Sequence, residues 1–303
     1  MNTILVLGGG GFLAGHIARH YGDLGWRVIA IGRSAERGPG DVRHMWQLPH
    51  SEFAHLLAAE RPEVCVNAAG QASVPASMSE PLSDFETSTV LNFRLMEDIR
   101  RSSPATAYIH LSSAAVYGDP PSLPVGEDAT IRPISPYGWH KRMTEMAVAE
   151  YAALFGLRAA SLRIFSAYGS GLRRQVIWDL VSKAVSLPDQ PLLVRGEASD
   201  SRDFVHGSDV AGAVEAVVAR GALRGEVYNT ASGVETSMET LASLISGLLG
   251  FTQVVDFDAA RRPGDPGRWH ADIRKLRGLG FTPQMELAEG VNEVIRERRS
   301  HPN

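Results

Sequence analysis

Residues 4–16 read ILVLGGGGFLAGH, a short apolar run followed at once by four glycines. The run predicts a buried strand, and Gly8, Gly11 and Ala14 follow it in GxxGxxA spacing at the start of an expected helix. Small residues let the backbone approach a pyrophosphate, and the free amides and dipole of a helix N-terminus favour that anion. The stretch therefore predicts the first strand, turn and helix of a dinucleotide-binding fold.

Further apolar runs alternate with helical stretches along the first half of the chain, at 28–31, 64–67, 107–113 and 158–165. This alternation predicts parallel βαβ units. Beyond 165 the pattern is irregular and rich in Gly, Pro and Arg, with helical pieces expected near 173–187, 236–249 and 286–298. We therefore expect an α/β protein with a Rossmann-type doubly wound parallel sheet and a smaller C-terminal α/β substrate lobe.

The composition indicates a soluble globular protein of one large domain or two. The 303 residues are 44% hydrophobic and 21% charged, with a net charge of −4 and scattered basic residues. This pattern argues against nucleic acid as a partner, although it leaves local phosphate binding open. Cys65 is the single cysteine, and the N-terminal residues resemble no signal peptide. No apolar run is long enough to span a membrane, so we expect a cytoplasmic protein without disulfides.

The end of the second expected strand bears on the cofactor. An acidic residue there would bind the ribose hydroxyls of NAD, but the chain has Gly32, Arg33 and Ser34. A guanidinium and a hydroxyl can bind a 2′-phosphate, which favours NADP(H) over NAD(H). The alternative is that Arg33 is a solvated surface residue.

The segment ISPYGWHKRMTE, residues 134–145, places Tyr137 and Lys141 four positions apart after a proline. On a helix both side chains lie on one face, so a phenol and an ammonium can reach the same small molecule. A nearby cation should lower the tyrosine pKa and make its hydroxyl a usable proton donor or acceptor. An amphipathic helix with an exposed lysine is the alternative.

These features form a set together with Ser113 at a strand end, NAAG at 67–70 and RDFVHGSDVA at 202–211. In this order they resemble the extended short-chain dehydrogenase/reductases, the NAD-dependent epimerase/dehydratase family, over nearly the whole chain. The resemblance implies that Ser113, Tyr137 and Lys141 are catalytic: tyrosine exchanges a proton with a sugar oxygen, serine fixes that oxygen, and lysine also contacts the nicotinamide ribose.

The resemblance also implies binding residues and domains. The cofactor would contact Gly8, Gly11, Phe12, Leu13, Arg33, Ser34, Ala68, Ala69, Gly70, Tyr137 and Lys141. A nucleotide-diphosphate sugar would contact Ser73, Ser112, Ser113, Tyr137, Ser166, Arg202 and Arg262, the two arginines holding the diphosphate. The cofactor domain would span 1–168 with a returning segment near 204–232, and 169–303 would mainly bind the sugar nucleotide.

Several reactions are compatible with this family. Ala114 and Ala115 stand where sugar 4,6-dehydratases carry acids, which disfavours dehydration. Arg33 favours an NADPH-dependent reductase, and segments such as SRDFVHGSDV look most like GDP-4-keto-6-deoxymannose reductases. A nucleotide-sugar epimerase with tightly bound NAD is the alternative, and a non-catalytic cofactor-sensing protein is a remote one. Ser88, where the family often has Asn, is a departure from its pattern.

Other residues carry weaker signals. His16 and His20 are four apart without a third ligand, so no metal site is expected. His140 could relay protons, but we expect it on a solvated helix face. The resemblance further implies a homodimer through helices near 83–101 and 138–155, the second with an apolar stripe of Met143, Met146, Ala147 and Tyr151.

Overall fold

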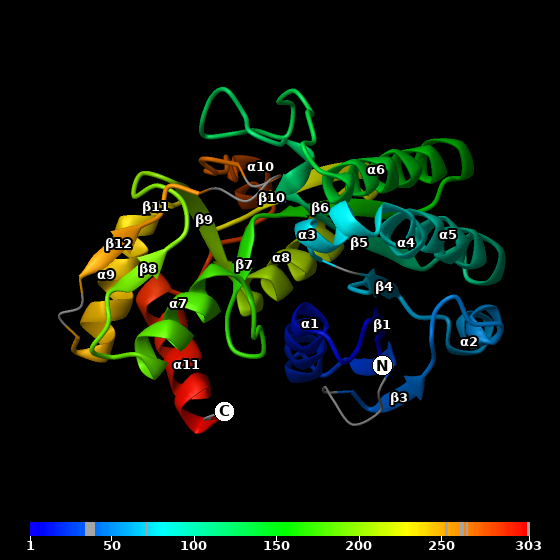
Figure 1. Cartoon of the computed structure of the whole chain (residues 1–303). Coiled ribbons are helices and arrows are strands. Elements are labelled where there is room, and N and C mark those ends of the chain that lie inside the picture. Colours follow the sequence, from blue (N-terminus) through cyan, green and yellow to red (C-terminus); the bar gives the residue numbers. More distant parts are fainter. Residues whose placement is uncertain (34–39, 71, 252–253, 261–263, 265, 302–303) are drawn as a thin grey trace.

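The computed structural model describes residues 1–33, 40–70, 72–251, 254–260, 264 and 266–301. Within these residues the centre is a seven-stranded sheet in the order β10-β6-β5-β4-β1-β2-β3, and all neighbouring strands are parallel (Figure 1). Its strands are β1 (Thr3–Leu7), β2 (Arg27–Gly32), β3 (Val42–Met45), β4 (Val64–Asn67), β5 (Ala107–Ser113), β6 (Ala159–Ile164) and β10 (Arg224–Thr230). The chain winds outward from β1 in both directions, which confirms the predicted doubly wound fold.

The strands correspond to the apolar runs of the sequence. Every residue of β1 and β4 is buried, as expected when helices cover both faces of a parallel sheet. The edge strand β3 was not predicted, because its four residues, VRHM, alternate between half-buried and exposed and form no apolar run. At the opposite edge, β10 pairs with β6, so a late segment of the chain completes the sheet.

Two layers of helices enclose the sheet. Helices α1 (Phe12–Asp23) and α8 (Gly207–Arg220) pack on one face, whereas α2 (Phe53–Glu60), α5 (Leu91–Ser102) and α6 (Pro136–Phe155) pack on the other. Each layer has its own apolar core against the sheet. The shorter elements are α3 (Val74–Ser79), α4 (Pro81–Phe85), a π-helical turn at Glu86–Val90, a 3₁₀ turn at Ala114–Val116 and α10 (Arg274–Arg277).

The smaller lobe packs around a third apolar core. Helices α7 (Gln175–Ser186), α9 (Met238–Leu249) and α11 (Leu287–Ser300) lie close to the expected helical ranges and surround it, as Figure 1 shows on the side away from α5 and α6. Its strands are β7 (Ser166–Tyr168), β8 (Leu192–Val194), β9 (Ser201–His206), β11 (Glu235–Ser237) and β12 (Val255–Phe257). They form the small sheets β11-β9-β7 and β12-β8. The domain boundary at residue 168 stays a prediction.

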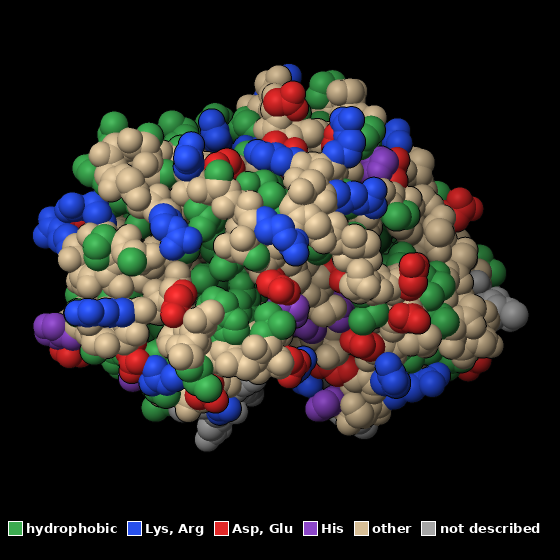
Figure 2. All heavy atoms as spheres, turned by 180° about the vertical axis from the view of Figure 1, so that it is seen from behind, with side chains coloured by type: hydrophobic (Ala, Val, Ile, Leu, Met, Phe, Trp, Pro, Cys, Tyr) green, Lys and Arg blue, Asp and Glu red, His purple; other side chains and the backbone are tan. Residues whose placement is uncertain are grey.

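The surface shows no basic stripe on the face drawn in Figure 2, where Lys and Arg side chains are interspersed with Asp and Glu. Such a mixed surface lacks the one-sign footprint of a nucleic-acid-binding protein. In the part of the chain that the structure describes, no helix combines the length and apolarity needed to cross a bilayer.

Candidate active site

The glycine turn joins β1 to α1 and opens the N-terminus of the helix. Gly8 has φ +84°, and a Cβ there would lie 2.7 Å from the carbonyl oxygen of Ala68, so only glycine fits. Gly11 precedes α1 and provides no side-chain hydrogen bond to the first turn. The amides of that turn are therefore available to an anion, which fits the predicted pyrophosphate site.

The NAAG loop follows β4 and lies beside the glycine turn. The Asn67 side chain donates to Asn92 Oδ1 at 2.9 Å and accepts from the amide of Ala69, also at 2.9 Å. Gly70 has φ +117°, outside the range that side chains favour. These contacts fix the loop, and Ala68, Ala69 and Gly70 line the same cavity as the start of α1.

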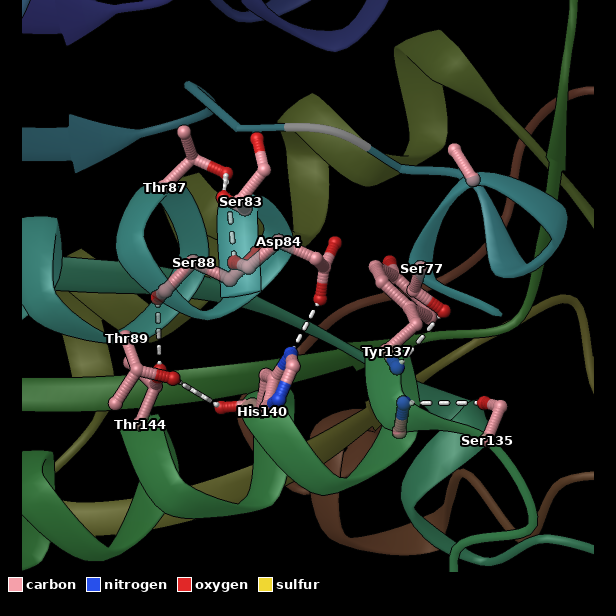
Figure 3. A network of polar contacts seen from close by, with 12 residues as sticks. Ser77, Ser83, Asp84, Thr87, Ser88, Thr89, Ser135, Tyr137, His140 and Thr144 are labelled. Atoms are coloured by element: carbon pink, nitrogen blue, oxygen red, sulfur yellow. Dashed lines mark hydrogen bonds and ion pairs between the residues drawn. The ribbon is translucent and has the colours of Figure 1, made fainter. Parts of the chain in front are cut away.

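Ser113 and Tyr137 meet on the cavity wall. Ser113 ends β5, where its hydroxyl accepts from the amide of Ala115 and hydrogen-bonds to the Tyr137 hydroxyl. Helix α6 begins at Pro136 after Ser135, whose hydroxyl caps the helix by accepting from Gly138 N at 3.2 Å (Figure 3). The cap and the proline fix the turn that carries Tyr137.

The expected lowering of the Tyr137 pKa is wrong for this structure. Burial raises the pKa to about 12, and although the hydrogen bond from Ser113 and the charge of Arg174 oppose this rise, they do not overcome it. Lys141 Nζ lies 5.7 Å from the centre of the Tyr137 ring and donates to the Leu111 carbonyl oxygen at 2.8 Å. The ammonium is therefore positioned by the strand end rather than by the phenol.

Lys141 is itself a perturbed group. Loss of solvation lowers its pKa to about 8, while the negative charges of Asp84 and Glu145 favour the charged form. A lysine poised near neutral pH in a cavity is characteristic of functional sites.

Glu145 anchors the inner side of α6, one turn beyond Lys141. Its carboxylate receives two hydrogen bonds from Arg163 of β6, at 2.9 and 2.8 Å, and one from Ser112 at 2.7 Å. Arg163 is 2% exposed, so the pair is fully enclosed. The Ser112 hydroxyl is thus engaged by Glu145, although this residue, predicted to bind substrate, does line the cavity.

One cavity of about 780 Å³ brings most of the predicted site residues together. It is lined by Gly11, Phe12, Leu13, Ala68, Ala69, Gly70, Ser73, Ser112, Ser113, Tyr137, Lys141, Ser166 and Arg202. Gly8 supports the turn without lining the cavity, and Arg33 is exposed one residue beyond β2. Ser34 and Arg262 lie outside the described residues.

Arg202 lies on the far wall, on β9. Its guanidinium is 5.6 Å from the Trp269 ring centre and donates to the carbonyl oxygens of Ser201 and Gly267. These contacts hold the guanidinium at the cavity wall. The predicted diphosphate role of Arg202 is compatible with this position.

Sequence reasoning missed the surroundings of His140. The side chain is buried and forms an ion pair with Asp84 of α4, with 2.5 Å between Nδ1 and Oδ2 (Figure 3). The expected solvated face is wrong, because α4 packs on this part of α6. Arg174, which faces Tyr137 from the start of α7, was also missed.

The weaker histidine signals have structural explanations. His16 packs against Gly207 and lies 5.3 Å, ring centre to ring centre, from His206, while His20 pairs with Glu215 at 2.8 Å. Among the described residues, no three His, Cys, Asp or Glu side chains are grouped as metal ligands.

Comparison with protein families adds a match over most of the chain. The model described as "NAD dependent epimerase/dehydratase family" matches residues 4–231. Two curated relatives match nearly end to end. The UDP-glucose 4-epimerase of Mycolicibacterium smegmatis is 31% identical, covering 96% of this chain and 96% of its own. The putative UDP-glucose 4-epimerase of Methanocaldococcus jannaschii is 28% identical, covering 96% and 97%.

Among solved structures, MoeE5 in complex with UDP-glucose and NAD is 27% identical, with a TM-score of 0.87 and 99% of both chains covered. These similarities support the predicted family. They do not support the specific likeness to GDP-4-keto-6-deoxymannose reductases, because both curated relatives have the names of UDP-glucose epimerases.

Proposed function

We propose, since the chain belongs to the NAD dependent epimerase/dehydratase family, that it is a nucleotide-sugar epimerase that uses NAD and inverts C4 of a UDP-sugar. The main support for this proposal is that Ser113, Tyr137 and Lys141 line one cavity together with the residues that follow the glycine turn. The chain is also similar over nearly its whole length to UDP-glucose 4-epimerases. The proposal replaces the reductase as the favoured reaction and takes up the alternative that the sequence left open.

The residues present fit a bound dinucleotide. The Gly8 position tolerates no Cβ, and the uncapped first turn of α1 offers amides to a pyrophosphate. Phe12, Leu13 and the NAAG loop border the same space. MoeE5 binds NAD, which supports NAD over NADP(H) as the cofactor here.

The chain's own groups supply the proton chemistry. A bound NAD, held by the glycine turn and the NAAG loop, would supply reversible hydride transfer at sugar C4 with no net change of the cofactor. The Tyr137 oxygen takes the proton of the 4-hydroxyl as the C4 carbonyl forms, and gives it back as the carbonyl is reduced. Ser113 donates to the same sugar oxygen. The Ser113 hydrogen bond and the charge of Arg174 favour the phenolate form of Tyr137, against the effect of burial. Both half-reactions balance in atoms and electrons.

A single assay tests the proposal. The purified protein is incubated with UDP-glucose, and the appearance of UDP-galactose is followed by proton NMR, with the Tyr137→Phe protein as the inactive control. We also expect denaturation of the protein to release NAD in about one-to-one amount, because an epimerase regenerates its cofactor in each turnover.

The same purified protein can be used to distinguish a reductase from an epimerase. Three results together would overturn the epimerase proposal. The purified protein would release no NAD, it would form no epimer from UDP-glucose or UDP-glucuronic acid, and it would oxidise NADPH in the presence of a nucleotide-4-keto-6-deoxy sugar. We also infer a cytoplasmic location, supported by the single, buried and unpaired Cys65.

A further inference from the structure

The connection between β7 and α7 forms part of the cavity wall. Its residues Gly169, Leu172 and Arg173 line the cavity, as do Phe12 and Leu13 at the start of α1. We call residues 169–173 the bridging segment. The pyrophosphate of a dinucleotide is expected at the start of α1, so the cofactor and the bridging segment would border the same part of the cavity.

One side of the bridging segment lies against α1. The Ser170 carbonyl oxygen accepts a hydrogen bond from His16 Nε2 at 3.3 Å. A Cβ on Gly171, which has φ +92°, would lie 3.8 Å from Phe12 Cδ2, so the backbone passes close beside that ring. Phe12 packs edge-on against His16, with 5.0 Å between the ring centres. The segment therefore contacts the end of α1 that would bind the cofactor.

The other side of the bridging segment is fastened to α11 by one carboxylate. Glu297 Oε2 accepts from the Gly171 amide at 2.7 Å, and Glu297 Oε1 accepts from Arg173 Nε at 2.9 Å. The Glu297 side chain is 13% exposed, so most of it is removed from water. Hydrogen bonds to a charged acceptor are stronger than neutral ones. The segment thus connects α1 to α11, and Figure 1 shows it between these two helices, after β7.

Contacts earlier on α11 set the position of the helix. Glu293, one turn before Glu297, has its Oε2 3.3 Å from His206 Nε2. Gly290 packs so closely on Tyr168 that a Cβ there would lie 2.6 Å from the phenolic oxygen. Residues 290, 293 and 297 are three and four positions apart, so they lie along one face of the helix. Contacts other than those of Glu297 therefore hold α11 in place.

We propose that Glu297 is a positioning residue that holds the bridging segment against the start of α1 and so slows the release of a bound dinucleotide. The identity of that dinucleotide, NAD, rests on the proposed function. Slow release suits an epimerase, because its cofactor is regenerated in each turnover and does not have to leave. Glu297 itself touches neither cofactor nor substrate in this assignment, and acts through Gly171 and Arg173.

The rate of NAD release measures this role without any turnover. The purified protein is loaded with radiolabelled NAD, an excess of unlabelled NAD is added, and the label that stays on the protein is followed over time. Glu297→Ala removes both acceptor oxygens. We expect release to become about tenfold faster, the effect typical of losing a hydrogen bond to a charged group.

Glu297→Gln is a second, more conservative variant. It keeps the length of the side chain and one acceptor oxygen for the Gly171 amide, but loses the charge that pairs with Arg173. Its release of NAD should be faster than that of the original protein and slower than that of Glu297→Ala. If Glu297→Ala does not fold, release from Glu297→Gln at the original rate overturns the proposal.

Two neighbours on α11 are matched controls. Glu289→Ala removes an exposed acid from the same helix and should leave the release rate unchanged. Arg298→Met removes the hydrogen bond from Arg298 Nη2 to Ser186 Oγ at 3.0 Å, which fastens the same end of α11 to α7. This variant should have a lower melting temperature but an unchanged release rate.

Two outcomes of these measurements would overturn the proposal. In one, Glu297→Ala releases NAD within about twofold of the original rate, the range of an ordinary surface substitution. In the other, Arg298→Met accelerates release as much as Glu297→Ala does, which would mean that Glu297 only stabilises α11.

Activity gives a second readout. After dilution into buffer without NAD, Glu297→Ala should lose epimerase activity faster than the original protein, and added NAD should restore it. A loss that added NAD does not restore would indicate damage to the fold and contradict the proposal. If the protein proves to be an NADPH-dependent reductase, radiolabelled NADP replaces NAD in the release measurement, which still decides the role of Glu297.

Discussion

At the scale of single residues, Tyr137 is the group on which the proposed chemistry depends. Tyr137→Phe keeps the ring and its packing but removes the hydroxyl that exchanges the proton, so kcat should fall by about 10²- to 10⁴-fold. NAD and UDP-sugar affinity should barely change, because the glycine turn and Arg202, rather than Tyr137, are the groups predicted to hold the diphosphates. Steady-state kinetics and equilibrium binding measure the two effects separately. A folded variant within about threefold of the original rate would show that another group carries the proton.

Arg33 tests the cofactor assignment. Arg33→Asp places a carboxylate beyond β2, where it would repel a 2′-phosphate and accept ribose hydroxyls. If Arg33 binds NADP, the ratio of NADPH to NADH affinity, measured by fluorescence titration, should fall by more than tenfold. Because Arg33 is exposed and MoeE5 binds NAD, we expect this affinity ratio to change by less than tenfold, as for a substitution at a surface residue.

Some of the candidate site residues could be predicted from the sequence alone, and others could not. The glycine turn and the Tyr137–Lys141 spacing are local patterns, so they could be predicted without a fold. The burial of His140 could not, because its partner Asp84 is 56 residues away on a five-residue helix that leaves no periodic signal. The raised pKa of Tyr137 likewise follows from enclosure by elements that assemble only in the folded chain.

At the scale of elements, the β1–α1 turn depends on Gly8. Gly8→Ala would place a methyl group 2.7 Å from the Ala68 carbonyl oxygen on a backbone with φ +84°. The left-handed conformation alone costs about 1–2 kcal/mol, and the clash should displace the NAAG loop. We expect a lower melting temperature together with weakened NAD binding. Gly22→Ala on α1, whose Cβ would meet nothing within 4 Å, is the matched control and should preserve both.

The contact of α6 with β6 depends on the Glu145–Arg163 pair. Arg163→Met leaves the Glu145 carboxylate buried with its main partner gone, which should lower the free energy of unfolding by about 3–5 kcal/mol. Arg142→Met removes a partly exposed partner of the same carboxylate and should cost about 1 kcal/mol or less. Urea denaturation compares the two. If both variants lowered the free energy of unfolding equally, the buried Glu145–Arg163 pair would contribute no more to stability than the partly exposed contact of Arg142.

At the scale of the whole molecule, two histidines from distant parts of the chain, His16 of α1 and His206 at the start of α8, pack against one another with 5.3 Å between their ring centres. Burial, with mutual repulsion for His16, lowers the pKa of His16 on α1 and of His206 before α8 from 6.5 to about 4. The folded state therefore binds fewer protons than the unfolded state. Their contribution to stability is present above pH 6.5 and is lost as the pH falls toward 4.

Thermal unfolding between pH 7 and 4 should show this loss. We expect the melting temperature to fall less steeply in His16→Gln than in the original protein, because one of the two depressed groups is removed. If the melting temperature of His16→Gln depended on pH as steeply as that of the original protein, other residues would be responsible for the loss of stability in acid.

The predicted homodimer belongs to this scale as well. The proposed stripe on α6 divides in the structure: Ala147 and Tyr151 are buried in the subunit, whereas Met143 and Met146 are 40% and 57% exposed. If the two methionines form part of a dimer contact, Met146→Glu should halve the mass measured by light scattering at micromolar concentration. Leu24→Glu, at an exposed apolar position on α1's end, should leave the mass unchanged. A monomeric original protein would refute the dimer.

The pairing of β10 with β6 has a consequence for how the chain is made. Val227 lies opposite Ser161, so the edge of β6 stays open until the ribosome has added more than sixty further residues. An open edge strand can pair with another chain, and long-range parallel pairing forms slowly. During synthesis the nascent chain therefore passes through a stage in which the residues of α6 have been added but the sheet still lacks its edge strand β10. We expect chaperones to bind the nascent chain most at that stage, because an unpaired strand edge makes a folding intermediate prone to aggregation.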